Sequence, residues 1–352
     1  MSGTPFADSL IFFQQPWERL SSILSRTPYS GTLIVCDANT RQHCLPYMLG
    51  QLNLENPLIF ELPVGEQTKS LAECERFWNF ALENGVGRKT ICLAVGGGVV
   101  TDFTGFCTSV LLRGIDCIYI PTSLMGMADA ALGGKTGINF MQFKNQIGLF
   151  KLPKAILIEP AFLKTLSESE LKNGYVEIIK HSLIQDPPFW EELRQRPGLP
   201  EMELLPELIR KSVRFKMEIV QKDFHETGLR QILNFGHSFG HAIEGMLLNS
   251  PHEMLHGQAV AYGIIYESWL SSQKFAWRAQ WFPQIKEMML PFLGAWRPQA
   301  ADFPGILKWM SADKKNLQGK IRMTLLERPG QPKYGVEVDA ELVNKTLEDC
   351  NF

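Results

Sequence analysis

The sequence predicts an α/β domain followed by a mainly α-helical domain. In the first half of the chain, short apolar runs rich in β-favouring residues alternate with stretches of helical periodicity, which is typical of a parallel sheet with helices on its faces. In the second half, the segments are long and favour helix. A chain of 352 residues is too long for one ordinary domain and fits two. We therefore expect the domains to be residues 1–166 and 167–352.

The α/β half is predicted to hold five strands, each a short apolar run. Between two of them, apolar residues recur at helical spacing within Ser70–Asn84, and Gly85 follows where a C-terminal cap would stand. A further helix is expected to start at Val99, just after the third strand. The strands are Thr32–Cys36, Pro57–Leu62, Thr90–Val95, Cys117–Ile120 and Ala155–Ile158.

The helical half begins with a clear start signal. Ser167–Glu170 (SESE) has the pattern of a capping box, in which a serine and the glutamate three residues later satisfy free backbone N–H groups at a helix start. We expect a helix from there to about Gln185, ended by Pro187-Pro188. The remaining expectations are two Pro-rich loops between helices, Arg196–Pro206 and Arg297–Pro304, and a hairpin formed by Lys320–Leu326 and Tyr334–Val338.

The composition argues against several classes of protein. Apolar residues make up 45% and charged residues 20%, so the chain can bury large cores. The net charge is −2, from 35 Lys plus Arg and 37 Asp plus Glu, whereas a nucleic-acid-binding protein usually has a basic stripe. No run of 18 apolar residues is present, and the N-terminus lacks the basic region of a signal peptide. Seven scattered cysteines without a C-x-x-C pair suit a reducing compartment. We expect a cytoplasmic protein with no membrane or nucleic-acid partner.

A glycine turn is the first candidate binding feature. Gly96-Gly97-Gly98 follows a predicted strand and precedes a predicted helix, and a helix N-terminus attracts phosphate. The turn lacks the G-x-G-x-x-G pattern, so a tight strand-to-helix connection is the alternative interpretation. Asp102 lies four residues after Gly98, where its carboxylate could bind a ribose or cap backbone.

A second glycine-rich stretch holds a lysine. Gly133-Gly134-Lys135-Thr136 matches the end of a P-loop, but Asp129 stands where that motif needs its first glycine. A Walker-type nucleotidase is therefore not expected. The lysine among glycines still suits an anion.

Histidines and a glutamate in the helical half are candidate metal ligands. His237 and His241 are four residues apart, so both would lie on one face of a helix. His256 follows, and Glu177 lies on the capped helix with Lys180 and His181 on neighbouring faces. These residues could form a zinc site with an open position. A hydrogen-bonded histidine pair in the core is the alternative.

His252–His256 (HEMLH) matches the H-E-x-x-H metalloprotease motif. The metzincin continuation is missing, Glu267 is the only nearby acidic candidate for a third ligand, and the motif leaves His237 and His241 without a role. Chance occurrence explains it better.

Basic residues stand beside these motifs although the chain is net acidic. Each one alone could be an ordinary surface residue. Together they predict a pocket for a small polyanion, because arginine and lysine bind such ligands strongly. They are Arg113, Lys135, Lys144, Lys180, Lys216, Arg230 and the pair Lys314-Lys315.

Seven motifs, taken together and in order, carry a resemblance to a known family. The chain closely resembles the 3-dehydroquinate synthases of the shikimate pathway, which belong to the sugar phosphate cyclases and are related to glycerol dehydrogenase. The resemblance runs from about Asp37 to Lys315. The motifs are GGGVVTDFTGF, LLRG, IPTSLMGMADAALGGKTGIN, KNQIGLF, NGYVEIIKH, LRQILNFGHSFGHAIE and LHGQAVAYG.

The resemblance implies a Rossmann-like, parallel-sheet domain that binds NAD, followed by a mainly α-helical domain that binds substrate and a divalent metal. The metal would be zinc, with cobalt as the alternative, and its ligands would be Glu177, His237 and His256. The resemblance assigns His241 to the substrate pocket and gives His181 no metal. It also implies a homodimer.

The resemblance further implies contacts to NAD and to substrate, with Lys135 and Lys144 in both sets. The NAD contacts are Asp37, Asn39, Glu66, Lys69, Gly97, Gly98, Asp102, Thr122 and Ser123. The substrate contacts are Arg113, Asp129, Lys135, Lys144, Asn145, Lys180, Lys216, Glu226, Arg230, Asn234, His241 and either Lys314 or Lys315.

The implied reaction makes the enzyme a carbon–oxygen lyase acting on a sugar phosphate. NAD⁺ would oxidise the C5 hydroxyl of 3-deoxy-D-arabino-heptulosonate 7-phosphate, with a metal stabilising the alkoxide. Phosphate would then leave by β-elimination, the hydride would return, and ring opening and aldol closure would give 3-dehydroquinate and phosphate. The substrate carries about three negative charges at neutral pH, which suits the basic cluster.

Three other functions remain as alternatives. A sibling cyclase would act on sedoheptulose 7-phosphate or glucose 6-phosphate, which lack the carboxylate. Arg230, Asn234, Lys216 and the pair Lys314-Lys315 keep the synthase pattern and argue against it. A polyol dehydrogenase would release NADH, and the many cations suited to phosphate argue against it. A non-catalytic descendant would have lost Lys135, Glu177 or a metal histidine, and none of these is lost.

The chain departs from the family pattern at positions beside the polar groups. One departure is an interval between His237 and His256 that is a few residues longer than expected. The others are Thr101, Phe103, Ser123, Met127, Ala130 and Ala131.

Overall fold

A computed structural model describes residues 10–11, 15–141, 143–185, 187–277, 281–312 and 321–350. These residues form two compact units. Unit 1 comprises the described residues up to Leu171 together with Leu205–Val213, and unit 2 comprises Lys172–Leu204 and the described residues from Arg214 onward. The division falls five residues after the expected position at 166, and one helical segment returns to unit 1. Lys314 and Lys315 lie outside the described residues.

A parallel sheet forms the centre of unit 1. Among the described residues it has six strands in the order β1-β8-β5-β4-β2-β3, and every neighbouring pair is parallel. All five predicted strands are confirmed. Strand β4 is buried along its whole length because it lies inside the sheet under helices. The strands are β1 (Leu10–Ile11), β2 (Gly31–Asp37), β3 (Leu58–Leu62), β4 (Thr90–Gly96), β5 (Asp116–Pro121) and β8 (Ala155–Leu157).

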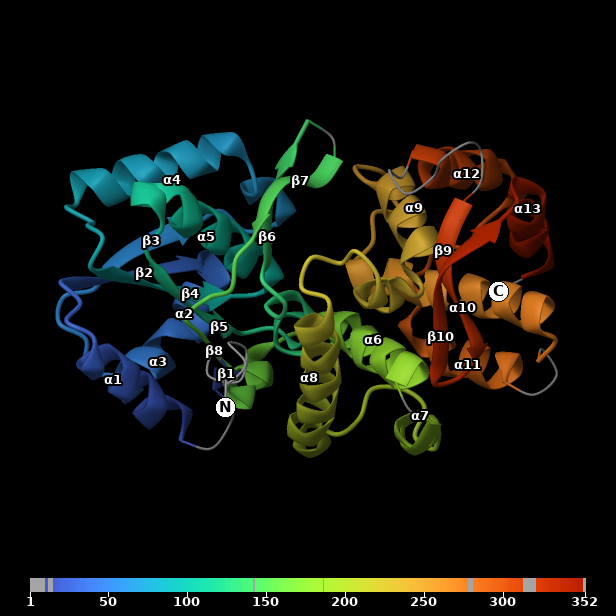
Figure 1. The fold of residues 1–352 in the computed structure, drawn as a ribbon, viewed down its shortest axis with the longest axis horizontal. Helices are drawn as coiled ribbons and strands as arrows, with labels where there is room; N and C mark the ends of the chain where they lie inside the picture. The colour runs from blue at the N-terminus through green and yellow to red at the C-terminus, as the bar shows by residue number, and fades with distance from the viewer. Residues whose placement is uncertain are drawn as a thin grey trace. The chain divides into compact units, whose positions relative to one another are not determined.

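Helices flank this sheet, with α1 and α3 below the strands and α4 and α5 above them in the view of Figure 1. The helix predicted within Ser70–Asn84 is confirmed as α4, since the Ser70 hydroxyl accepts a hydrogen bond from the Glu73 N–H at 3.3 Å. Gly85 follows it at φ +73°. The helices are α1 (Pro16–Arg26), α2 (Ala38–His43), α3 (Leu45–Gln51), α4 (Leu71–Glu83) and α5 (Gly98–Val110).

An antiparallel hairpin of β6 (Lys135–Phe140) and β7 (Phe143–Phe150) also belongs to unit 1 and packs against α5. The sequence did not predict it. Its strands approach closely at Gly148, where a Cβ atom would lie 2.2 Å from the Thr136 carbonyl oxygen. A side chain cannot be accommodated there without moving the backbone.

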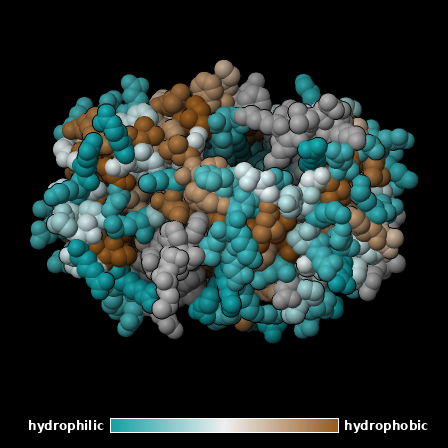
Figure 2. Space-filling view, in the orientation of Figure 1, coloured by the Kyte–Doolittle hydropathy of each residue, from teal (hydrophilic) through white to brown (hydrophobic). Residues whose placement is uncertain are grey.

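Exposed apolar side chains gather on unit 1. They include Leu71 and Leu82 on α4 and Phe140, Leu149 and Phe150 on the hairpin. In the space-filling view, brown surface lies over the part of unit 1 where α4 and the hairpin lie, among mostly hydrophilic residues (Figure 2).

Unit 2 is mainly helical, as predicted. The helix expected at the capping box is α6, where the Glu170 N–H donates to the Ser167 hydroxyl at 3.3 Å. The predicted hairpin is confirmed as β9 and β10, although Lys320 lies outside the described residues. The elements are α6 (Glu168–Gln185) and α8 (Leu205–Lys222), whose first residues belong to unit 1, then α7 (Pro187–Arg194), α9 (His237–Leu247), α10 (His256–Phe275), α11 (Phe282–Met289), α12 (Phe303–Ala312), β9 (Ile321–Arg328), β10 (Gln331–Val338) and α13 (Ala340–Asp349).

Prolines lie in the first turn of three helices, at positions where the sequence predicts a helix stop or a loop. Pro187 starts α7 directly after α6. The two Pro-rich loops end early, because α8 starts at Leu205 and α12 at Phe303, each one residue before a proline. Proline is tolerated in the first turn of a helix, where its missing N–H has no partner to lose.

Helices α9 and α10 pack with their backbones unusually close. A Cβ atom at Gly263 would lie 1.8 Å from the Gly236 carbonyl oxygen, and one at Gly240 would lie 3.1 Å from the Val260 Cα. Gly236 has φ +81°, a conformation that favours glycine. This contact places the first residues of both helices near each other. Within the described part of the chain, no helix is both long and apolar enough to cross a membrane.

Candidate functional site

The glycine turn lies at the carboxyl ends of two adjacent strands of unit 1. Gly97 is the N-cap of α5 and follows β4, while the Thr122 N–H after β5 donates to the Gly96 carbonyl at 3.0 Å. A Cβ atom at Gly97 would lie 3.1 Å from the Ser123 hydroxyl. Folds with a parallel sheet bind ligands at the carboxyl ends of the strands. Four predicted NAD contacts lie together at this edge, namely Gly97, Gly98, Thr122 and Ser123.

The side chain of Thr101 supports this turn. Its hydroxyl donates to the carbonyl oxygens of Gly97 at 3.3 Å and Gly98 at 3.1 Å. At the end of β2, Asp37 caps α2, accepting a hydrogen bond from the Thr40 N–H at 2.8 Å. Asn39 is exposed in the first turn of that helix.

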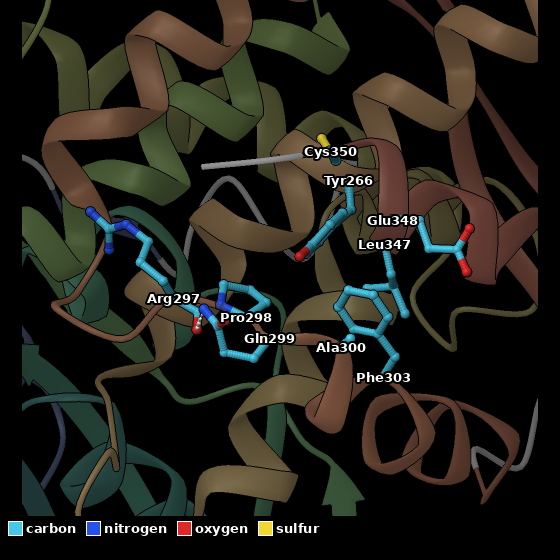
Figure 3. Close-up of a pocket in the computed structure, with 9 residues that line it drawn as sticks. All are labelled: Tyr266, Arg297, Pro298, Gln299, Ala300, Phe303, Leu347, Glu348 and Cys350. Atoms are coloured by element: carbon cyan, nitrogen blue, oxygen red, sulfur yellow. Dashed lines mark hydrogen bonds between the residues drawn. The ribbon is translucent and has the colours of Figure 1, made fainter.

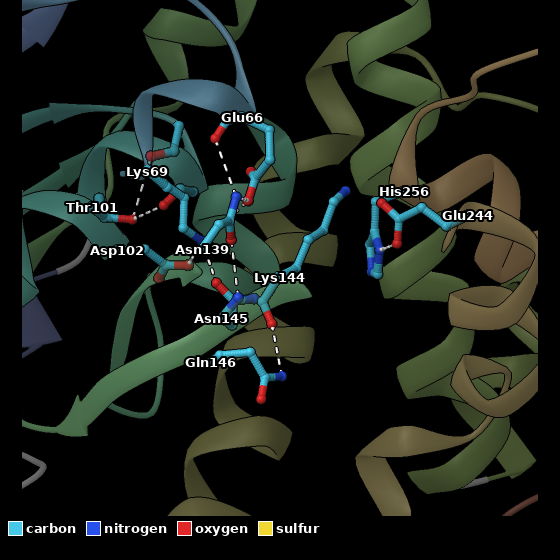
Figure 4. Close-up of polar contacts among 12 residues, drawn as sticks. Glu66, Lys69, Thr101, Asp102, Asn139, Lys144, Asn145, Gln146, Glu244 and His256 are labelled. Carbon is cyan, nitrogen blue, oxygen red and sulfur yellow. Dashed lines mark hydrogen bonds and ion pairs between the residues drawn. The ribbon is translucent and has the colours of Figure 1, made fainter. Parts of the chain in front are cut away.

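Lys69 is the centre of a polar network in unit 1 (Figure 4). Its side chain is 3% exposed, and its Nζ lies 2.8 Å from Asp102 Oδ2, 3.5 Å from Glu66 Oε1 and 2.5 Å from Asn145 Oδ1. Burial alone would lower the pKa of Lys69, but the carboxylates of Asp102 and Glu66 outweigh it and raise that pKa. Lys69 therefore stays charged and pairs with Asp102.

The other predicted substrate contacts of unit 1 come from the hairpin and from two irregular turns. Lys135 opens β6, and Lys144 and Asn145 lie near the start of β7. Arg113 is exposed at φ +68° after α5, and Asp129 lies in the π-helical turn Gly126–Ala130.

The candidate metal ligands come together in unit 2. His237 and His256 are the first residues of α9 and α10, and His241 lies one turn along α9. Each of the three histidines offers a ring nitrogen, and these nitrogens lie within 4.8 Å of one another. The carboxylate of Glu177 is fully buried, and its Oε1 lies 3.7 Å from the Nε2 of both His237 and His256.

Hydrogen bonds fix the two rings that face Glu177. His237 Nδ1 lies 3.2 Å from the Phe235 carbonyl oxygen, and His256 Nδ1 lies 3.2 Å from Glu244 Oε2. Such partners leave each Nε2 available on the side of Glu177. Lys180, also buried, forms an ion pair with the same carboxylate.

The charges of this cluster suit a cation. Burial, and then the charge of Lys180, lower the pKa of His237 well below its usual value. Burial acts against protonation of His256 too, but Glu244 and Glu177 outweigh it and raise the pKa of His256 to about 10. The carboxylates thus attract positive charge to this position.

The distances also fit a metal. Two donors about 2.1 Å from one tetrahedral zinc ion lie roughly 3.4 Å apart, close to the separations observed here, and nitrogen and carboxylate oxygen are zinc ligands. The residues present therefore fit a divalent metal.

The remaining predicted contacts of unit 2 lie on α8 and on the turn that follows it. Lys216 and Arg230 are nearly fully buried, at 5% and 2% exposure. Arg230 donates to the Phe224 carbonyl at 2.6 Å, and the Asn234 amide donates to Glu226 Oε1 at 2.7 Å. Buried cations and an amide–carboxylate pair are suited to an anionic, hydroxyl-rich ligand.

The structure rules out the metalloprotease interpretation of His252–His256. Helix α10 begins only at His256, so His252 and Glu253 lie in the preceding turn rather than on the same helix face. Glu253 accepts a hydrogen bond from the Asn249 N–H at 3.2 Å. This turn belongs to the interval that is longer than expected.

A cavity of about 470 Å³ in unit 2 holds none of the predicted site residues. Its walls combine apolar and polar side chains, and Arg297 and Glu348 direct their charged groups outward (Figure 3). The lining residues are Tyr266, Arg297, Pro298, Gln299, Ala300, Phe303, Leu347, Glu348 and Cys350.

Comparison with known proteins decides the family. The model of the 3-dehydroquinate synthase N-terminal domain matches residues 59–173, and that of the C-terminal domain matches residues 174–316. The 3-dehydroquinate synthase of Parabacteroides distasonis is 34% identical, with 95% of this chain and 94% of the relative covered. That of Thermosynechococcus vestitus is 36% identical, with 93% and 91% covered.

The chain belongs to the 3-dehydroquinate synthase family. Solved structures share its fold. A 2-deoxy-scyllo-inosose synthase complexed with carbaglucose-6-phosphate, NAD⁺ and Co²⁺ superposes with a TM-score of 0.84 at 21% identity, with 97% of this chain and 96% of that chain covered. A 2-epi-5-epi-valiolone synthase from Streptomyces hygroscopicus with NAD⁺ and Zn²⁺ bound gives 0.79 at 24% identity and the same coverage.

Sequence reasoning missed several residues that support the site of this family member. Glu244 lies three residues after His241 on α9, so helical spacing could have indicated it. Glu267 was considered only as a protease ligand, yet it accepts hydrogen bonds from the N–H groups at the start of α9. Asp223 and Asn139 gave no signal, because their partners depend on turns that the sequence did not predict.

Proposed function

We propose that this chain catalyses the reaction of its family, the conversion of 3-deoxy-D-arabino-heptulosonate 7-phosphate to 3-dehydroquinate and phosphate. The enzyme is a carbon–oxygen lyase of the shikimate pathway. Similarity to 3-dehydroquinate synthases over more than nine-tenths of the chain carries this proposal. The buried cation and histidine clusters support it, because they supply the charges that a phosphate, a carboxylate and a metal require.

We place NAD at the carboxyl edge of the unit 1 sheet. The turn at Gly97 and Gly98 leaves room for backbone to approach a pyrophosphate at the N-terminus of α5. When bound, NAD supplies reversible oxidation of the C5 carbinol. Glu66 and Asp102, held by Lys69, present carboxylates that can accept hydrogen bonds from ribose hydroxyls. Asp37, Asn39, Thr122 and Ser123 are the other proposed contacts.

We assign the metal to Glu177, His237 and His256 and give His241 to the substrate. When bound, zinc would supply Lewis acidity toward the oxygen of the C5 hydroxyl, which loses its proton when C5 loses a hydride. Lys180 holds Glu177 in place and adds positive charge beside it. Cobalt, present in one structural neighbour, is the alternative metal.

Basic and amide side chains in each unit bind the substrate's anionic ends. Arg230 presents a rigid guanidinium fork suited to a carboxylate or phosphate, whereas the lysines act as point charges. The proposed contacts of unit 1 are Arg113, Asp129, Lys135, Lys144 and Asn145. Those of unit 2 are Lys180, Lys216, Glu226, Arg230, Asn234 and His241. The contact by Lys314 or Lys315 stays a prediction from the sequence.

We further propose a cytoplasmic homodimer. All seven cysteines lie within the described residues as buried thiols outside any disulfide, which supports a reducing compartment. The homodimer rests on the family resemblance.

The test supplies zinc-loaded enzyme and NAD⁺ with heptulosonate phosphate and, separately, with sedoheptulose 7-phosphate, and measures released phosphate. We expect release from the first substrate alone. Release from sedoheptulose 7-phosphate alone would make the enzyme a sibling cyclase. No release from either, with NAD and metal bound, would contradict the proposal.

A further inference from the structure

Asn139 lies near the end of β6 and is not among the predicted site residues, yet its side chain joins two groups of them (Figure 4). Its Nδ2 donates to Glu66 Oε1 at 3.0 Å and to the Glu66 carbonyl at 3.3 Å. Its Oδ1 accepts the backbone N–H of Asn145 at 2.9 Å. Its own backbone N–H donates to the Lys69 carbonyl at 2.8 Å. Both ends of the amide are therefore used.

The backbone of the hairpin is irregular at this residue. The pairing of β6 with β7 shifts between Ile138 and Phe140, so Asn139 lies at a bulge. Bulges turn a side chain away from the regular direction of a strand. Here the bulge turns the amide toward the segment that holds Glu66 and Lys69.

The partner of Asn139 on the other strand is also in an unusual conformation. Asn145 has φ +53°, in the left-handed region. Two hydrogen bonds hold it there, one from its N–H to Asn139 and one from Lys69 Nζ to its Oδ1 at 2.5 Å. The preceding residue is Lys144, so the same contacts fix the start of β7.

We infer that Asn139 is a positioning residue that holds the cofactor-side loop (Glu66–Lys69) and the substrate-side residues Lys144 and Asn145 in one arrangement. The inference rests on the proposed function, which assigns Glu66 to NAD and Asn145 to substrate. Asparagine is suited to this role because one side chain offers a donor to a carboxylate and an acceptor to a backbone N–H. Neither alanine nor aspartate can do both.

Two variants separate the two halves of the role. Asn139→Asp keeps the acceptor for the Asn145 N–H but removes the donor to Glu66 and adds a like charge beside it. It should weaken NAD binding, measured directly by fluorescence titration with NADH, by roughly ten- to a hundredfold, the effect of one hydrogen bond to a charged group, and leave the KM for heptulosonate phosphate nearly unchanged. Asn139→Ala removes both bonds and should raise that KM as well.

A rescue experiment distinguishes positioning from general support of the fold. In Asn139→Asp/Glu66→Gln, the new amide can donate to the new carboxylate, so the hydrogen bond is restored in reverse. Its NADH affinity should exceed the value expected from adding the two single changes. Leu149→Ala, on the same hairpin but outside this network, is the matched control and should leave NADH affinity and KM unchanged.

Three results would overturn the inference. The first is unchanged NADH affinity and KM in Asn139→Ala. The second is an equal loss in Asn139→Ala and Leu149→Ala that follows the melting temperature. The third is strict additivity in the double variant. If the wild-type enzyme neither binds NADH nor releases phosphate, the proposed function fails and the inference falls with it, whereas failure of the variants alone leaves the proposed function standing.

Discussion

At the scale of single residues, the residue types of the metal site could be predicted from the sequence, but the residues that hydrogen-bond to its candidate ligands could not. The spacing of His237 and His241 indicated one helix face, and α9 confirms it. The choice between His241 and Glu177 as a ligand came from resemblance, because helical spacing does not show which elements meet. The structure places all four candidate side chains in one cluster and adds Glu244 as a partner of His256.

Two histidine variants test the ligand assignment. His237→Ala should weaken zinc binding by more than the roughly 10- to 100-fold that loss of an outer partner costs. His252→Ala should leave zinc binding unchanged, because His252 lies before α10. Zinc content after dialysis against a chelator gives the answer. The reverse result would contradict the assignment of His237 as a zinc ligand.

Asp223 gives a prediction that depends on pH. Its carboxylate accepts the N–H groups of Thr227, Gly228 and Arg230 at 2.8–3.0 Å. Burial opposes ionisation, but the backbone hydrogen bonds from Arg230, Gly228 and Thr227 together outweigh it and lower the pKa of Asp223. A pKa that is lower in the folded state stabilises the fold above the unfolded value of about 3.9, and that contribution is lost as pH falls through the folded pKa.

Asp223→Asn should therefore destabilise the enzyme at pH 7 and much less near pH 3. Urea unfolding of metal-free protein at both pH values measures the difference. An equal loss at both would show that the charge of Asp223 contributes nothing.

At the scale of elements, parallel strands and long helices could be predicted because their patterns are local. The hairpin of β6 and β7 could not, because its glycine-rich and polar sequence lacks the alternation of a half-buried strand. The same holds for the close packing of α9 on α10, since glycines at 236, 240 and 263 reveal their role only when both helices are present.

Glu267 links these two helices and carries a prediction at this scale. Its buried carboxylate on α10 accepts the N–H groups of Gly236, Ser238 and Phe239 at 2.6, 2.9 and 3.2 Å, at the positive end of α9. Glu267→Gln should lower the free energy of unfolding of metal-free enzyme by about 2 kcal/mol, typical of a hydrogen-bonded charge, and weaken zinc binding. Exposed Glu287→Gln is the control. Stability and zinc affinity equal to those of the control would contradict this role.

At the scale of the whole molecule, the two-part organisation was predictable from the change of pattern along the chain. The assignment of Leu205–Val213 to unit 1 was not predictable, because no local sequence pattern indicates which unit the first half of α8 packs with.

The reactivity of the cysteine thiols tests the packing of the cores in which they are buried. Burial raises the pKa of Cys36 and of Cys44 to about 11, and all seven thiols are buried. A buried, protonated thiol reacts slowly. Ellman's reagent at pH 8 should titrate almost no thiol in the native enzyme and all seven in denaturant. Rapid reaction of several native thiols would contradict the described packing.

The central claim is that NAD is used and regenerated within one catalytic cycle. Zinc-loaded enzyme should be given heptulosonate phosphate in large excess over NAD⁺, with 3-dehydroquinate and NADH both measured. We predict many molecules of 3-dehydroquinate for each NAD and no net NADH. One NADH accumulating for each substrate consumed, without 3-dehydroquinate, would contradict the account and show a dehydrogenase.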